Sequence, residues 1–511
     1  MSLRGVLVTA QPSLSAHEGN SAGVWTWNTW LPAYLVAASF FVLGPSPFSA
    51  RLPFALSGIL SLWLAWLLFR SDEEDGLVER SPFASEAGLV LLAFSPPFLL
   101  FCRQSRYYAL VALGTLLVLH SWRRLLAGKP WGAVAVAFSL QFLLHSSFAF
   151  FACACLALVL DAVLRFDECP RGGRFWGAAL LTLALAGPVA WYFRIWDRPG
   201  NHLYPISESL EFLKTFLLWL VAFAVPLALV AAVFVRRWVL VAVGFILLCG
   251  LVSEGALSRL CAVLVLLAVS AAAAREPAPY GVMNLRRMSL LLVASTLALL
   301  SFTAAEPYGR YLAGLLPVIA YLLGRGFSSL GRGQAPAVAG LVMVTLMGNL
   351  FFVGPLKAAQ ALAPNVSVDS VSGMMRRRLR DLSLRSDLLR FAAEVFRGPE
   401  GYIEVAASAM KAGGGKTFFS DADSLSLMSA TGLRPVYPEE LRTAEPDWLL
   451  PSPWLRLSPD QDARVKELLA SGRYELAAVE APQLMWQNNP DPLFRDFSPH
   501  KGPLLLFRRR P

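Results

Sequence analysis

Residues 131–164 read WGAVAVAFSLQFLLHSSFAFFACACLALVLDAVL and set the fold class. The stretch carries one charged residue, Asp161, close to its end. A helix needs about 20 mostly apolar residues to cross a membrane, so this stretch holds two spans. The polar residues His145, Ser146 and Ser147 fall near its middle. We therefore predict a tight helical hairpin with spans over 131–146 and 147–164.

The rest of the first 356 residues repeats this apolar pattern. The 511 residues are 56% hydrophobic and only 16% charged, against about 25% charged in ordinary soluble domains. This composition excludes a disordered chain, a fibrous chain and a set of soluble domains. It predicts an all-α polytopic membrane protein with about twelve spans. The other ten lie near 53–70, 85–102, 107–122, 176–193, 213–235, 238–252, 257–274, 288–304, 311–324 and 336–356.

The loops between these spans predict the orientation. One set of loops holds 15 Lys and Arg and the other holds 9. The richer set is cytoplasmic by the positive-inside rule, which leaves both termini external. The net charge of +10 thus reflects loop charges, and we expect no nucleic-acid partner. External arginines at membrane ends run against this rule, so they are candidates for binding an anion.

Four regions follow from the composition shifts. Residues 1–52 form an external loop with an interfacial helix over 30–44, and 53–356 form the transmembrane domain. Residues 357–398 form a basic amphipathic connector, and 399–511 a small external α/β domain. In that domain we predict helices over 400–412 and near 422–430. Its strands are expected near 416–419, 434–437, 447–451, 474–479 and 503–508.

Three external clusters combine arginine with tyrosine or proline. The first is Arg51 with Pro53, the second is Arg103, Arg106, Tyr107 and Tyr108, and the third is Arg310 with Tyr311. An arginine fork donates two parallel hydrogen bonds to a phosphate, so the clusters suit a phosphate near the bilayer surface. Anchoring arginines at helix starts and an interface belt of Arg and Tyr explain the same residues.

Other reactive patterns are missing from the sequence. It shows no nucleophile triad, no zinc spacing and no phosphate-binding Gly-rich loop. We therefore expect no metal site. The six cysteines all lie in the membrane half; Cys153 and Cys155 are interpreted as packing residues, as is His145.

Two motifs in combination resemble one family. They are Gly-x-Ser-x-x-Ser-Ala-Arg-Leu-Pro at Gly44–Pro53 and Ser-Pro-Pro-Phe-Leu-Leu-Phe-x-Arg-Gln-x-Arg-Tyr-Tyr-Ala-Leu at Ser95–Leu110. The chain resembles the protein mannosyltransferase-like branch (glycosyltransferase family 39) of the GT-C superfamily. The resemblance is strongest over 24–120 and extends through Arg310–Pro317. It implies a GT-C-like fold and a bacterial inner-membrane enzyme that takes a sugar from a polyprenyl-phosphate carrier on the outer face.

The resemblance implies roles for individual residues. Arg51, Arg103, Arg106, Tyr107, Arg310 and Tyr311 match positions that bind the donor phosphate. The acceptor is an extracytoplasmic lipid, glycan or protein, and membrane lipids surround the enzyme. No cofactor is specified, although the resemblance leaves room for a divalent cation.

One departure concerns the catalytic base. Family members begin with a spanning helix followed by an acidic pair, which this sequence lacks before its first span. We expect that the true start lies upstream, which would give thirteen spans, or that the chain is a degenerate member. Glu18 is the only acidic residue before the first span and is the candidate base. Two other classes stay open: a non-catalytic relative that binds the lipid carrier, and a transporter or flippase of lipid-linked sugars.

Overall fold

The structure is a computed structural model that forms two compact units. The first contains every described helix up to Gly326, and the second contains the described elements from Tyr402 onward. The described residues are 29–74, 84–165, 173–193, 204–218, 220, 255–276, 281–304, 309–326, 402–420, 424–437, 440–451, 459–479 and 504–510.

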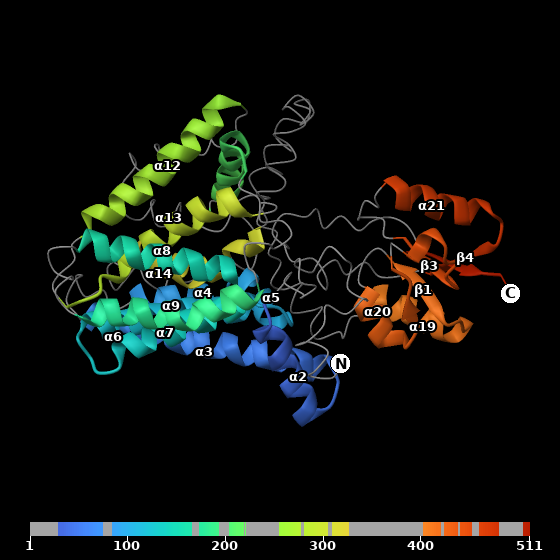
Figure 1. Ribbon diagram of the computed structural model, residues 1–511, viewed down its shortest axis with the longest axis horizontal. Coiled ribbons are helices and arrows are strands. Elements are labelled where there is room, and N and C mark those ends of the chain that lie inside the picture. Colours follow the sequence, from blue (N-terminus) through green and yellow to red (C-terminus); the bar gives the residue numbers. More distant parts are fainter. Residues whose placement is uncertain are drawn as a thin grey trace, which may run out of the picture. The chain divides into compact units, whose positions relative to one another are not determined.

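The first unit is helical throughout its described part (Figure 1). Five of its helices are long and apolar enough to cross a membrane, namely α3, α6, α9, α12 and α13. Together with the composition, they make the chain an integral membrane protein. The helices are α2 (Leu31–Leu43), α3 (Pro47–Glu74), α4 (Ala84–Ala93), α5 (Pro96–Arg103), α6 (Tyr108–Leu126), α7 (Gly132–Ser146), α8 (Phe148–Leu164), α9 (Gly173–Phe193), a helix over 206–218, α12 (Ala256–Arg275), α13 (Leu285–Thr303), the 3-10 helix η3 (Gly309–Leu315) and α14 (Leu316–Gly326).

The predicted hairpin is confirmed, with α7 ending at Ser146 and α8 beginning at Phe148. Ser147 stands between them and caps α8, since its side chain accepts a hydrogen bond from the backbone N–H of Phe150. The predicted spans 238–252 and 336–356 and most of 213–235 lie outside the described residues. The count of twelve therefore stays a prediction.

Two predicted spans are wrong as single α-helices. The span 85–102 is two helices, α4 and α5, because Ser95 takes an extended conformation before Pro96, and the residue before a proline disfavours helical geometry. The span 311–324 begins as the 3-10 helix η3 and becomes α-helical only at Leu316.

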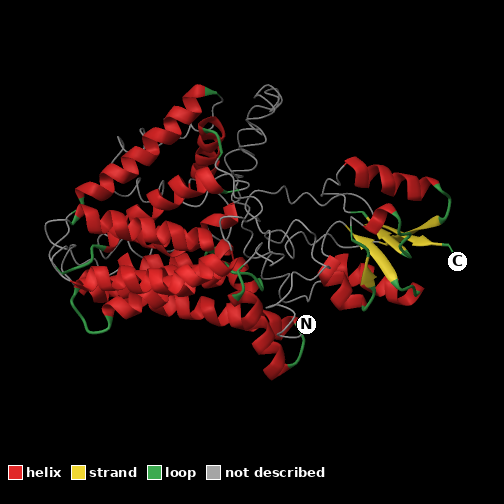
Figure 2. Ribbon diagram, in the orientation of Figure 1, coloured by secondary structure: helices red, strands yellow, loops and turns green. Residues whose placement is uncertain are grey.

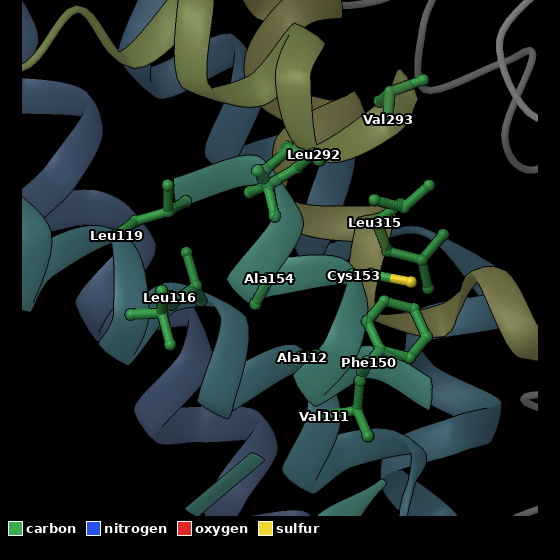
Figure 3. Close-up of a cluster of buried hydrophobic side chains, with 14 of the residues drawn as sticks. Val111, Ala112, Leu116, Leu119, Phe150, Cys153, Ala154, Leu292, Val293 and Leu315 are labelled. Atoms are coloured by element: carbon green, nitrogen blue, oxygen red, sulfur yellow. The ribbon is translucent and has the colours of Figure 1, made fainter. Parts of the chain in front are cut away.

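Helices α6 and α13 lie at the centre of the first unit and are mostly buried, whereas α9 and α12 are mostly exposed. Figure 3 shows the core between α6, α8 and α13, where Leu116 and Leu119 face Ala154 and Leu292. The exposed face of α9 carries Trp176 near one end and Trp191 near the other. Their separation along the helix is about 22 Å, and the pair suits the two interfaces of a bilayer.

The second unit contains a five-stranded mixed sheet (Figure 2). The strand order is β2-β1-β3-β5-β4, in which β1 pairs parallel with β2 and β3, and β5 pairs antiparallel with β3 and β4. The elements are α19 (Tyr402–Gly413), β1 (Thr417–Ser420), α20 (Ser424–Thr431), β2 (Arg434–Pro435), η4 (Glu440–Arg442), β3 (Trp448–Leu450), α21 (Pro459–Ala470), β4 (Tyr474–Val479) and β5 (Leu504–Arg509).

Helices cover both faces of this sheet. Met410 of α19 and Leu427 of α20 pack on the face that carries Phe418. Leu468 of α21 packs on the opposite face, against Phe419. The five predicted strands are present, but the sequence analysis missed α21. Its sequence, PDQDARVKELLA, is polar on average, so no apolar run marked it.

Candidate functional site

The first cluster lies where α2 turns into α3. Ser46 and Ser49 form a reciprocal cap: the Ser46 hydroxyl oxygen accepts from the Ser49 N–H at 3.1 Å, and the Ser49 hydroxyl oxygen accepts from the Ser46 N–H at 2.9 Å. The Ser49 hydroxyl also donates to the carbonyl of Gly44 at 2.6 Å. Gly44 ends α2 with φ of 77°, a conformation that favours glycine. The turn before Arg51 is therefore held by several short bonds.

Pro53 explains how α2 is fastened to this turn. Proline has no N–H, so Pro53 leaves the carbonyl of Ser49, four residues earlier, without its helical donor. The hydroxyl of Ser39 in α2 donates to that carbonyl at 2.6 Å. A proline inside α3 thus creates the acceptor that holds the last turns of α2.

The second cluster lies beside the first. The hydroxyl of Ser105, in the loop between α5 and α6, donates to the carbonyl of Ala50 at 2.9 Å. Ala50 directly precedes Arg51 and Ser105 directly precedes Arg106, so this bond joins two motifs that are 55 residues apart. Both arginines are exposed, while Arg103 and Tyr107 are half-buried. The Tyr107 ring packs on Tyr108, with ring centroids 4.5 Å apart.

The third cluster lies on η3, which packs against α5 and α6. A Cβ atom on Gly314 would lie 2.3 Å from Phe150 and 2.7 Å from Val111, so η3 touches the first turns of α6 and α8. Arg310 and Tyr311 are half-buried at the start of η3, with the guanidinium 5.6 Å from the ring centroid. We define the Arg51 end of the unit as the first turns of α3 and α6, the last turn of α5, and η3.

The charge at the Arg51 end is partly uncompensated. Neither Arg51 nor Arg106 forms an ion pair or hydrogen bond with any residue that the structure describes. Exposed guanidiniums without a described partner offer hydrogen-bond donors to an anion from solvent. Glu18, the predicted base, lies outside the described residues.

The opposite end of the unit is arranged differently. We define the Asp161 end as the last turns of α3, α6 and α8 and the first turn of α13. Asp161 is fully buried and accepts hydrogen bonds from Trp122 Nε1 at 2.9 Å and Arg165 Nε at 3.0 Å. Arg287 Nε lies 3.1 Å from its other oxygen. Nearby, Asp72 accepts from the Tyr321 hydroxyl at 2.5 Å.

A metal site is not evident in the described part of the chain. No group of three or more His, Cys, Asp or Glu side chains there is placed to hold an ion. Glu211 binds cationic side chains instead, with Lys214 Nζ and Arg259 Nε each 3.0 Å from its oxygens.

The sequence analysis missed Ser39, whose hydroxyl fastens α2 to the first cluster, and Ser105, whose hydroxyl joins the first and second clusters. Pro53 was a signal for the first, because a proline within a helix leaves a carbonyl without a donor. Nothing in the sequence indicated the second, since its acceptor is a backbone carbonyl far along the chain.

Comparisons with known proteins give no family. No family model matches the chain, and no curated protein matches it. Two crystal structures of ArnT from Cupriavidus metallidurans are similar to it at 13% sequence identity. The structure bound to undecaprenyl phosphate has a TM-score of 0.49, covering 94% of this chain and 87% of that chain. The apo structure has a TM-score of 0.46, covering 89% and 86%.

Proposed function

We propose that the chain is a membrane glycosyltransferase of the GT-C type. It transfers a sugar from a polyprenyl-phosphate carrier to a lipid, glycan or protein acceptor outside the cytoplasm of a bacterium. Within that superfamily, the motifs at Gly44–Pro53 and Ser95–Leu110 favour the protein mannosyltransferase-like branch. On this proposal the Arg51 end and the second unit are external.

One observation carries the proposal. Arg51 and Arg106 belong to the two motifs of the resemblance, and the Ser105 hydroxyl joins their neighbouring residues. Both arginines are exposed and have no carboxylate partner among the described residues. Arginines that serve only as membrane anchors do not require a hydrogen bond between their neighbouring residues. Two motifs that meet at one site are what a shared ligand requires.

The chemistry follows from the charge of the leaving group. When the sugar leaves its carrier, negative charge develops on the carrier's phosphate. The bound carrier phosphodiester already holds one negative charge, so guanidiniums that face it stabilise the more highly charged phosphate of the transition state more than the bound donor, which lowers the barrier to transfer. Tyr107 and Tyr311 supply further hydrogen-bond donors. Glu18 remains the proposed base for the acceptor.

A non-catalytic carrier-binding protein is the second candidate. It is favoured by the composition of the Arg51 end, whose described residues include exposed arginines and no carboxylate. A transporter or flippase has less support. The buried ionisable residues Asp161 and Lys214 of the described part each lie against ionic partners within the unit.

The test is a transfer assay with membranes that contain the chain and radiolabelled polyprenyl-phosphate sugars. Arg106→Ala is expected to abolish transfer and to leave the protein folded, because Arg106 is exposed and packs little. Arg124→Ala is the matched control, since Arg124 is an exposed arginine near the opposite end of α6. Wild-type turnover by Arg106→Ala would remove that arginine from the site. Carrier binding without transfer by the wild-type chain would favour the second candidate.

A further inference from the structure

Ser105 belongs to no part of the chemistry above, yet its hydroxyl occupies a central position. The hydrogen bond from this hydroxyl to the Ala50 carbonyl joins the loop that carries Arg106 to the helix that carries Arg51. We propose that Ser105 is a positioning residue that fixes the spacing of Arg51 and Arg106 before the phosphate arrives. This inference rests on the proposed function, because it needs the two arginines to share one anionic ligand.

The helix side of this contact is rigid. The carbonyl of Ala50 lies in the first turn of α3, directly after the Ser46 and Ser49 cap. The Ser39 hydroxyl adds α2 to the same turn through the carbonyl that Pro53 leaves free. Serine hydroxyls therefore fix the backbone beside Arg51 from two sides.

The loop that carries Arg106 depends on the Ser105 hydrogen bond more than the first turn of α3 does. Gln104 to Arg106 form bends between α5 and α6 and lie outside both helices, where no helical ladder sets their position. Like charges repel, so two arginines that are to bind one phosphate need a constraint against displacement of the loop before the anion is bound. A neutral bond from Ser105 to the Ala50 carbonyl opposes that displacement. The arrangement lowers the cost of ordering the loop when a phosphate binds.

The bond has little importance for folding, because it lies at the exposed surface. Hence Ser105→Ala should fold like the wild type while it binds the carrier more weakly. One lost hydrogen bond corresponds to a decrease in affinity of about fivefold. Ser105→Thr keeps the hydroxyl and should restore the affinity. Ser270→Ala is the matched control, since the Ser270 hydroxyl bonds only to Leu266 of its own helix.

The experiment measures the affinity of detergent-purified full chain for undecaprenyl phosphate. It compares the wild type, Ser105→Ala, Ser105→Thr, Ser270→Ala, Arg106→Lys and the double variant of Ser105→Ala with Arg106→Lys. Arg106→Lys keeps the charge and loses the planar fork, so binding stays measurable. A positioning role predicts that Ser105→Ala weakens the wild type about fivefold and weakens Arg106→Lys much less. A merely structural role predicts the same loss in both backgrounds.

The outcomes separate this inference from the proposed function. Wild-type affinity of Ser105→Ala, or an equal loss in both backgrounds, would overturn the positioning role while leaving the arginines in the site. The Arg51→Ala variant is added to the experiment to test the proposed function itself. If it binds undecaprenyl phosphate as tightly as the wild type, the proposed function is wrong at its first step, whatever Ser105 does.

Discussion

The two ends of the helical unit use arginine in opposite ways. At the Asp161 end, Arg165 and Arg287 are buried and lie against one buried carboxylate. At the Arg51 end, Arg51 and Arg106 are exposed, and no carboxylate among the described residues neutralises them. A buried charge must be compensated within the fold, whereas an exposed charge is free to bind a ligand. The difference teaches that arginine position alone does not mark a site in a membrane protein, but burial and pairing do.

Removal of the buried carboxylate is the strongest way to test this comparison. Asp161→Asn leaves two buried guanidiniums without their anion and is expected to destabilise the protein by about 3–5 kcal/mol. Thermal unfolding of the detergent-purified chain measures the loss. Glu445→Gln is the matched control, because Glu445 also lies against two arginines, Arg473 and Arg509, but their side chains are 53% and 41% exposed. We expect a loss of about 1 kcal/mol or less there.

Equal stability of Asp161→Asn and the wild type would contradict the comparison, since the Asp161 end would then tolerate unpaired charge. Arg51→Ala supplies the reverse check. Because Arg51 is exposed and has no described partner, its removal should change the stability by no more than about 0.5 kcal/mol.

A second prediction concerns how the Arg51 end is assembled. Gly314→Ala would place a methyl group 2.3 Å from Phe150 and 2.7 Å from Val111. The overpacking should cost about 1–3 kcal/mol and shift η3, which carries Arg310 and Tyr311. We therefore expect a lower unfolding temperature and weaker binding of undecaprenyl phosphate. Gly177→Ala in α9 is the control, because nothing lies within 4 Å of the added methyl group.

Gly177→Ala should stabilise its helix slightly, by up to about 1 kcal/mol. If Gly314→Ala lowers stability but leaves carrier binding unchanged, η3 is a packing element and does not belong to the phosphate site. The Arg51 end would then consist of α3, α5 and α6 alone.

The sequence predicted the helical elements better than their breaks. Apolar runs located α6, α7, α8, α9, α12 and α13 to within a few residues, because a helix in lipid must be apolar over its whole length. The break at Ser95 was missed although Pro96 and Pro97 marked it. The 3-10 segment before α14 was missed as well, although Pro317, the second residue of α14, marked the change, because proline lacks the N–H that an α-helix extending back to Ala313 would need.

The site residues were predicted in a similar way. Charge and the external loops singled out Arg51, Arg106 and Arg310, since external arginines run against the positive-inside rule. The sequence did not reveal that Ser105 joins two of these clusters. A hydroxyl that bonds to a distant backbone carbonyl leaves no pattern, because any residue supplies that carbonyl.

A carboxylate of the second unit adds a third arrangement to the comparison of buried and exposed charges, because backbone groups are among its partners. Asp447 accepts hydrogen bonds from the N–H of Lys416 at 2.7 Å and of Thr417 at 3.0 Å. Partial burial raises the pKa of Asp447, but these bonds, the Thr417 hydroxyl and the charge of Arg509 outweigh it and lower the pKa below its ordinary value. The charged form is thus stabilised without a buried ion pair.

The sign of the pH effect follows from that direction. A carboxyl group whose pKa is lowered by folding contributes stability above its unfolded pKa, about 3.9, and the contribution is lost as the pH falls through the folded value. Asp447→Asn should therefore be less stable than the wild type at pH 6, by at most about 1 kcal/mol because the group is partly exposed. The difference should shrink toward zero below about pH 3. Calorimetric unfolding of the full chain between pH 6 and pH 2.5 checks this.

The control is Asp462→Asn, which removes an exposed carboxylate that pairs only with Lys466. Its stability difference from the wild type should stay near zero over the whole pH range. A constant deficit of Asp447→Asn across the whole range would mean that Asp447 acts through packing, and that charge compensation outside the membrane half contributes nothing to the fold.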